Sequence, residues 1–140
     1  MVVERGETVH LEYDDVENIL YFSFPNVEIE SAEGLVMHFG RMVSFWRRHC
    51  GGRKVYSVVN YDGLQINARL TDVYATQLQR IVDFSIAIVR YGGSSLQRTS
   101  SRLANMKLHT ASRICSSREE ALEIVRALKA SEMAVVSPAR

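Results

Sequence analysis

The sequence predicts one α/β domain whose mixed sheet begins with an N-terminal hairpin and continues with parallel strands. A chain of 140 residues has the usual length of a single domain. Its central stretch, Lys54–Gly63, is a nearly continuous β-branched and aromatic run that ends in a polar turn, which is typical of a strand buried on both faces. Similar runs alternate with helical patterns in the order ββαβαβαβα, which indicates parallel strands after the hairpin, right-handed crossovers and about four helices.

Local patterns place the elements of the first half. Val9–Tyr13 alternates apolar and polar residues, as a half-exposed edge strand does, and a turn joins it to a second strand at Ile19–Phe24. Ser31 stands at a helix N-cap position, and the helix that follows ends at Gly51-Gly52. Its apolar face is formed by residues at helical spacing: Leu35, Val36, Phe39, Met42, Val43 and Trp46.

The second half continues the alternation. The expected elements are a helix at 70–82, a strand at Phe84–Val89, a polar helix carrying Leu96, Leu103 and Met106, and a short strand at Ala111–Cys115. Ser117 and Glu120 form a capping box that opens the last helix. The domain is expected to span residues 8–130, with flexible tails at 1–7 and 131–140.

Composition narrows the classes of partner. Seventeen basic and 16 acidic residues give a net charge of +1, so no overall attraction to nucleic acid or to an anionic membrane is expected. No stretch has the length of a membrane span, and the N-terminus lacks the apolar run of a signal peptide. Cys50 and Cys115 are too few for a disulfide framework or a zinc site. We therefore expect a cytoplasmic protein that holds no metal and no cofactor.

The polar corner after the central strand is the first candidate site. Asn60, Tyr61 and Asp62 follow this strand, and ligands of α/β sheets collect beyond the carboxyl ends of the strands. The three side chains could act in acid–base chemistry or bind a ligand, or Asp62 could simply fix its own turn. No nucleophile and base stand at a recognisable spacing, so no enzymatic activity is expected.

A glycine-rich corner is the second candidate. Gly92 and Gly93 follow a predicted strand, and Ser94 and Ser95 precede a predicted helix, so free backbone N–H groups and the helix dipole would favour an anion. Two cations of that helix, Arg98 and Arg102, could reach a phosphate or carboxylate. The corner lacks the G-K-[ST] of a P-loop, and a glycine turn capped by serine fits the same residues.

A basic surface is the third candidate. Arg41, Arg47 and Arg48 fall near the polar side or the end of the first long helix. Cations at a helix C-terminus stabilise the helix dipole, which explains them without a partner. They could also form a surface for a protein partner, together with the exposed edge of the N-terminal hairpin.

Two resemblances apply to this pattern. The runs FSIAIV, from Phe84, and ICSSREEALEIV, from Ile114, resemble the STAS fold of SpoIIAA-like proteins. Residues 11–128 are similar to the small domain appended to some bacterial acyl-CoA:acetate/3-ketoacid CoA-transferase-like proteins. The matching motifs are Tyr21–Asn26, Val58–Asp62, Asp72–Tyr74, Arg90-Tyr91, Lys107-Leu108 and Ser117–Ala121.

These resemblances imply a non-catalytic protein-binding, regulatory or accessory module, for example a partner subunit of a larger acyl-CoA-related enzyme. The CoA-transferase catalytic domain with its glutamate nucleophile is absent, so no transferase activity carries over. A STAS phosphoswitch would need a hydroxyl after the central strand, but Asn60–Asp72 contains no serine, and Thr71 is expected to cap a helix. The expected partner is another protein or a second copy. The alternative function is a sensor that binds a nucleotide, acyl or CoA-type anion near Gly92–Arg102.

Overall fold

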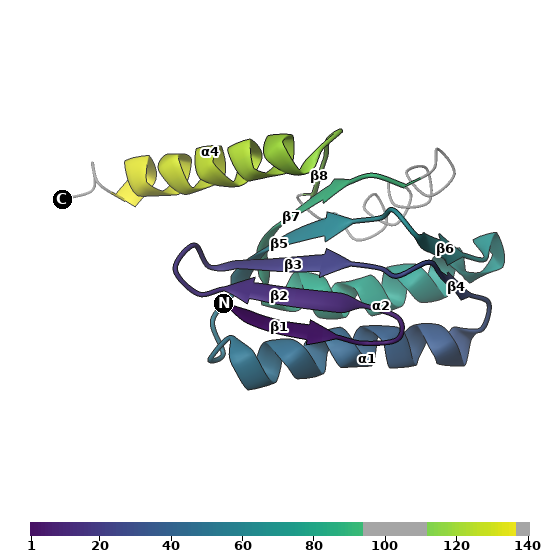
Figure 1. Cartoon of the computed structure of the whole chain (residues 1–140). Coiled ribbons are helices and arrows are strands. Elements are labelled where there is room, and N and C mark those ends of the chain that lie inside the picture. The colour runs from purple at the N-terminus through teal and green to yellow at the C-terminus, as the bar shows by residue number, and fades with distance from the viewer. Residues whose placement is uncertain (94–111, 137–140) are drawn as a thin grey trace.

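The protein forms a mixed six-stranded sheet with helices on both faces (Figure 1). The computed structural model describes residues 1–93 and 112–136. The sheet has the order β1-β2-β3-β5-β7-β8, and β4 and β6 form a separate pair. The strands are β1 (Val2–Arg5), β2 (His10–Asp14), β3 (Ile19–Ser23), β4 (Val27–Ile29), β5 (Val55–Asn60), β6 (Leu64–Ile66), β7 (Ser85–Tyr91) and β8 (Ser112–Ile114). The helices are α1 (Ala32–His49), the 3-10 turn η1 (Ala68–Leu70), α2 (Thr71–Phe84) and α4 (Arg118–Val136).

The direction of the strands agrees with the sequence prediction. β1, β2 and β3 run antiparallel in turn, whereas β3, β5, β7 and β8 are parallel to one another. The strands predicted at Lys54–Asn60 and Phe84–Val89 correspond to β5 and β7, which are neighbours. Val58 and Val59 of β5 are both buried. An apolar run without alternation therefore marked a central strand, as expected for a strand covered on both faces.

The two faces of the sheet carry separate apolar clusters. α1 and α2 cover one face, and α4 covers the other (Figure 1). The larger cluster joins β2, β3 and β5 to α1 and α2. The smaller one packs Val125 of α4 against Tyr56, Val58 and Val89 of the sheet.

Helix α1 begins and ends where the sequence indicates. The Ser31 hydroxyl accepts a hydrogen bond from the Gly34 N–H at 3.0 Å, which satisfies one of the free donors of the first turn. After His49 the chain turns through Gly51 and Gly52, both with positive φ. Glycine adopts this conformation without steric cost, so the helix stops there.

Both ends of the chain differ from the prediction. Val2–Arg5, expected within a flexible tail, is strand β1, because the turn that begins at Gly6 folds it back onto β2. The outer edge of the N-terminal hairpin is therefore β1 and not Val9–Tyr13. Helix α4 continues to Val136, past the expected start of the C-terminal tail at residue 131.

Several internal elements also differ. The order ββαβαβαβα omits the strands β1, β4 and β6, so the predicted strand order is wrong in detail. The described residues contain three α-helices, and the predicted helix with Leu96, Leu103 and Met106 lies outside them. Phe84 ends α2 instead of starting a strand, since its ring stacks on Trp46 with centroids 4.9 Å apart. Thr71 does not cap α2: Leu70 stands at the N-cap, no side chain there accepts a capping hydrogen bond, and the Thr71 hydroxyl donates to the Ala68 carbonyl.

Candidate functional site

Strand β1 forms an outer edge of the sheet. The Gly6 N–H donates to the Val9 carbonyl at 2.9 Å and closes the tight turn between β1 and β2. Hydrogen-bonded and non-hydrogen-bonded pairs alternate along an antiparallel ladder. Gly6 and Val9 form a hydrogen-bonded pair, so in the observed register the next hydrogen-bonded pairs are those of Glu4 and Val2. The backbone groups of Val2 and Glu4 therefore point toward β2, whereas those of Val3 and Arg5 point away from it. The outer edge therefore presents the N–H and C=O groups of Val3 and Arg5.

The β1 edge, residues 1–5, also carries exposed apolar side chains. Met1, Val2 and Val3 have exposed fractions of 69%, 38% and 48%. They are consecutive, so the apolar side chains and the outward backbone groups lie on the same strand. An edge of this kind is a template for pairing with another strand unless something covers it.

Beside this edge lies a hollow of about 540 Å³, which we name the β1–α1 groove. The end of β1 and the turn after it form one wall, and α1 forms the other. Gly40 and Ser44 are small residues, so α1 leaves open space beside them, and Met37 of the same helix is exposed. The complete lining is Glu4, Arg5, Gly6, Glu7, Met37, Gly40, Arg41, Ser44 and Arg48.

Two of the three arginines predicted as a partner surface line this groove. Arg48 pairs with Glu4 at 2.9 Å, and Arg41 donates to the Thr8 hydroxyl at 3.3 Å. Arg47, in the last turn of α1, is exposed and does not line the groove. Because Arg48 is neutralised by a carboxylate of β1, the groove presents charges of both signs rather than a basic patch.

The two corners predicted separately from the sequence lie together in the structure. The Asp62 carboxylate accepts a hydrogen bond from the Gly93 N–H at 2.8 Å. The Asn60 side chain accepts one from the Asp62 N–H at 2.9 Å, an Asx turn that fixes the end of β5. Gly92 has φ +74°, and a β-carbon there would lie 2.7 Å from the Asn60 amide oxygen. Ser94, Ser95, Arg98 and Arg102 lie outside the described residues.

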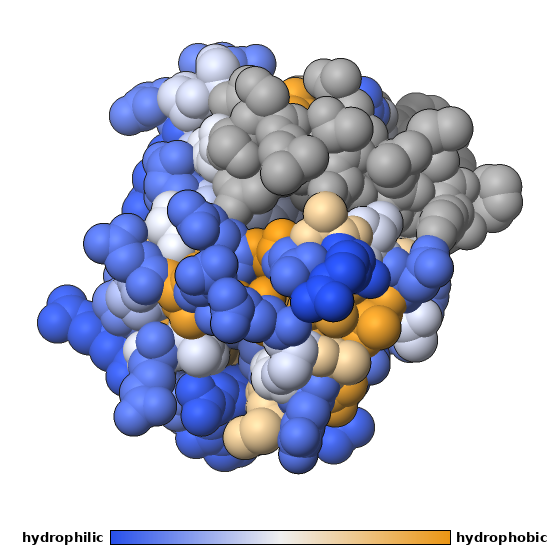
Figure 2. All heavy atoms as spheres, turned by 90° about the vertical axis from the view of Figure 1, so that its right-hand side faces the viewer, coloured by the Kyte–Doolittle hydropathy of each residue, from blue (hydrophilic) through white to orange (hydrophobic). Residues whose placement is uncertain are grey.

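This corner faces an open hollow of about 480 Å³ at the carboxyl end of the parallel strands. Figure 2 views this end of the molecule, where apolar surface lies among polar side chains. Glu28 and Asp62 line the hollow, and none of the described lining residues is basic. A carboxylate already occupies the Gly93 N–H, so the described part of the corner favours a neutral or cationic group over an anion.

A small buried cavity lies between the sheet and α1. Its volume is about 20 Å³, room for about one water molecule, and aromatic and aliphatic side chains of the sheet, α1 and α2 line it. Tyr61, predicted as part of an open corner, instead points into this core, where its hydroxyl bonds to that of Tyr74. His38 is also buried there, and its Nδ1 has no hydrogen-bond partner among the described residues. Burial, followed by the charge of Arg41, lowers the pKa of His38 to about 4, so the ring is neutral at pH 7.

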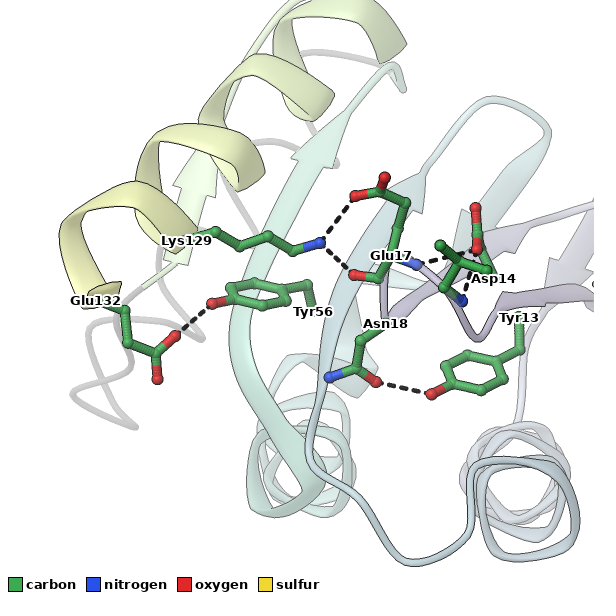
Figure 3. A network of polar contacts seen from close by, with 8 residues as sticks. Tyr13, Asp14, Glu17, Asn18, Tyr56, Lys129 and Glu132 are labelled. Carbon is green, nitrogen blue, oxygen red and sulfur yellow. Dashed lines mark hydrogen bonds and ion pairs between the residues drawn. The ribbon is translucent and has the colours of Figure 1, made fainter. Parts of the chain in front are cut away.

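Helix α4 is attached to the sheet by polar contacts at its carboxyl half (Figure 3). The Tyr56 hydroxyl donates to Glu132 at 2.7 Å, and Lys129 pairs with Glu17 at 3.0 Å. Burial, with the neighbouring Glu132 carboxylate, raises the pKa of Tyr56 to about 12. These contacts hold α4 over the start of β5, on the face opposite α1 and α2.

Within residues 1–93 and 112–136, no three His, Cys, Asp or Glu side chains come together as metal ligands. In the same part of the chain, no helix is both long enough and apolar enough to cross a membrane.

Comparison with known proteins identifies the fold. No protein-family model and no curated protein matches the chain. An uncharacterised protein of the DUF3478 family from Shewanella loihica PV-4, whose solved structure has a SpoIIAA-like fold, is similar in structure. The TM-score is 0.58 at 11% sequence identity, over 84% of this chain and 92% of that one. At this identity the likeness concerns the fold alone, and the chain is a mixed α/β protein similar to the SpoIIAA-like, or STAS, fold.

Proposed function

We propose that the protein is a non-catalytic STAS-like module that binds another polypeptide chain at the β1 edge and the adjacent β1–α1 groove. One observation carries this proposal: Val3 and Arg5 present outward backbone groups on a strand that also exposes three consecutive apolar side chains. An added strand would pair with those groups and cover the apolar side chains.

The chemistry of the groove indicates what a partner strand would carry. Gly40 and Ser44 leave space for side chains that point toward α1. Glu4 and Arg48 already satisfy each other, so a partner needs no matching charge at that point. A segment with apolar residues at alternate positions fits this surface best, since alternate side chains of a strand face the same side.

The resemblance to the domain appended to CoA-transferase-like proteins suggests a cellular role for the module. In this role it is a cytoplasmic regulatory or accessory subunit that binds a larger acyl-CoA-related enzyme without taking part in its chemistry. The SpoIIAA-like fold is consistent with such a role, because a fold does not by itself imply an enzymatic activity.

Affinity capture with edge variants tests the proposal. The tagged wild type is compared with Val3→Lys, because a lysine on an edge strand opposes pairing with another strand. Val16→Lys is the matched control, since Val16 is 87% exposed in the turn between β2 and β3, away from the edge. A second, differently tagged copy of the protein is expressed in the same cells.

The wild type and the control are expected to retain the same chains, and Val3→Lys is expected to lose them. If no chain, the second copy included, depends on Val3 for its retention, the proposed function is wrong.

A ligand sensor is the second candidate, because the 480 Å³ hollow at the carboxyl end of the strands has room for a small molecule, although its described lining is acidic. Under this alternative a nucleotide, acyl or CoA-type anion binds near Gly92–Arg102. Phosphate, a nucleotide or CoA should then raise the melting temperature, and Arg98→Ala combined with Arg102→Ala should abolish the shift. A ligand at 100 times its dissociation constant would stabilise the protein by about 2.7 kcal/mol. Unchanged melting curves at millimolar concentrations would exclude this candidate.

A further inference from the structure

We infer that the polypeptide bound at the β1 edge is a second copy of this chain, paired antiparallel through β1 with Val3 opposite Val3 of the second copy. This inference rests on the proposed function and names its partner. It follows from the direction of the backbone groups on β1, from the symmetry of a two-copy sheet and from the order of charges along the strand.

Symmetry restricts how two β1 strands can meet. In a two-fold dimer the same surface patch is used on both copies. For two antiparallel strands that extend one sheet, the two-fold axis is perpendicular to the sheet. Side chains opposite each other must then point to the same face. Neighbouring residues of a strand point to opposite faces. The axis must therefore pass between one residue and the same residue of the second copy. The possible centres on β1 are Val2, Val3, Glu4 and Arg5.

Charge and length distinguish these centres. A Glu4 or Arg5 centre would place like charges directly opposite each other, which destabilises a sheet. A Val2 centre places Val3, Glu4 and Arg5 of each strand opposite residues that precede β1 of the second copy. The Val3 centre pairs residues 1–5 of each copy, with Val2 opposite Glu4 and Met1 opposite Arg5. It is the centre that uses the whole strand without opposing like charges.

The backbone supports the same register. Val3 and Arg5 are the residues whose N–H and C=O groups point away from β2. With Val3 at the centre, the two Val3 residues exchange hydrogen bonds, and Arg5 bonds to Met1 of the second copy. Each outward group of the strand thereby gains a partner.

The side chains of β1 are also compatible with this pairing. Val3, exposed in the single chain, comes to lie against Val3 of the second copy, while Met1 lies beside Arg5 and Val2 beside Glu4 of that copy. Glu4 remains paired with its own Arg48, so no unpaired charge is brought against Val2 of the second copy. The result is a continuous sheet that runs through both copies with neither β1 edge left open.

Cysteine crosslinking tests this register in the full chain. Residues opposite each other in a hydrogen-bonded pair have Cα atoms about 5.5 Å apart, within the range of a disulfide. Val3→Cys should therefore form a covalent dimer under mild oxidation. Arg5→Cys is the matched control, because it lies on the same face of β1, but its two copies would be separated by roughly 14 Å along the strands. Cys50 and Cys115 are buried, so the unmodified protein should not crosslink.

Light scattering on the unmodified protein supplies the second measurement. The expected mass at high concentration is twice 15.9 kDa, and Val3→Lys is expected to return it to 15.9 kDa. A monomeric mass at every concentration, or crosslinking of Arg5→Cys as fast as of Val3→Cys, would overturn the inference. If capture of a different chain still depended on Val3, the proposed function would survive with another partner. If neither the second copy nor another chain depended on Val3, both would fail.

Discussion

The Asp62 carboxylate accepts a hydrogen bond from the Gly93 N–H at 2.8 Å, although the two residues are 31 positions apart. This contact joins the turn after β5 to the turn after β7, the two neighbouring parallel strands at the centre of the sheet. The turn after β7 is therefore fixed by a side chain from the turn that follows the neighbouring strand β5. Replacing Asp62 with alanine should lower the free energy of unfolding by about 1 kcal/mol, the typical value of one hydrogen bond.

Denaturant unfolding measures this difference. Asp15→Ala is the control, because Asp15 is an exposed carboxylate in the turn between β2 and β3. If the two variants were equally stable, the contact between Asp62 and Gly93 would contribute nothing to folding.

Gly92 and Gly52 provide a matched pair for the second prediction. Both have φ +74°, so alanine carries the same conformational cost at either position, about 1 kcal/mol. A β-carbon at Gly92 would lie 2.7 Å from Asn60 and 2.9 Å from Asp62, whereas one at Gly52 would meet no atom within 4 Å. Gly92→Ala should therefore cost at least about 1 kcal/mol more than Gly52→Ala, by crowding. Equal midpoints of urea unfolding for the two variants would contradict this packing.

Some of this arrangement could be predicted from sequence, because it depends on neighbours in the chain. The N-cap at Ser31, the stop at Gly51-Gly52 and the buried strand β5 each follow from a few consecutive residues. The Asx turn at the end of β5 is made by the Asn60 side chain, whereas the Asp62 carboxylate, which could have fixed its own turn, bonds to Gly93 instead.

The remainder depends on contacts between distant segments. Val2–Arg5 combines two valines with two charged residues and shows no alternation, and it becomes a strand only because β2 supplies its partner. β4 and β6 are strands of three residues that pair across 37 positions, Val27 with Leu64, so neither has a local signal. Arg90 follows the strand predicted at Phe84–Val89, but it lies in β7, and its burial at 1% exposure depends on α1 and α2 packing over that face.

His38 predicts a dependence of stability on pH. Its pKa is about 4 in the folded protein and about 6.5 in an unfolded chain, because burial disfavours the charged ring. The unfolded state therefore binds a proton first as the pH falls. The contribution of His38 to the free energy of unfolding is complete above pH 6.5 and is lost as the pH falls through 4. The total loss in the free energy of unfolding is about 3 kcal/mol. His38→Leu should show a flatter stability curve than the wild type over this range.

Phe39→Leu is the control for that series, since Phe39 packs beside His38 in the same core and carries no ionisable group, so its curve should keep the slope of the wild type. Parallel curves for the wild type and His38→Leu between pH 6.5 and 4 would show that His38 is not buried in the neutral form.

The contact between Tyr56 and Glu132 predicts coupling between α4 and the sheet (Figure 3). Tyr56→Phe and Glu132→Ala should each lower stability by about 1 kcal/mol, the first by losing the bond and the second by leaving a buried hydroxyl without its acceptor. The double variant should cost less than the sum of the two single ones, because both remove the same interaction. Strict additivity in a double-mutant cycle would mean that this bond does not hold α4 on the sheet.

Amide hydrogen exchange along β1 tests most directly whether its edge is a binding surface. In the dilute, unassociated protein the outward N–H groups of Val3 and Arg5 should exchange rapidly, whereas that of Glu4, directed toward β2, should be protected. At concentrations where the protein associates, Val3 and Arg5 should become protected to a similar extent as Glu4. Rapid exchange of Val3 and Arg5 in the associated protein would contradict the account, because the chains would then meet at another surface.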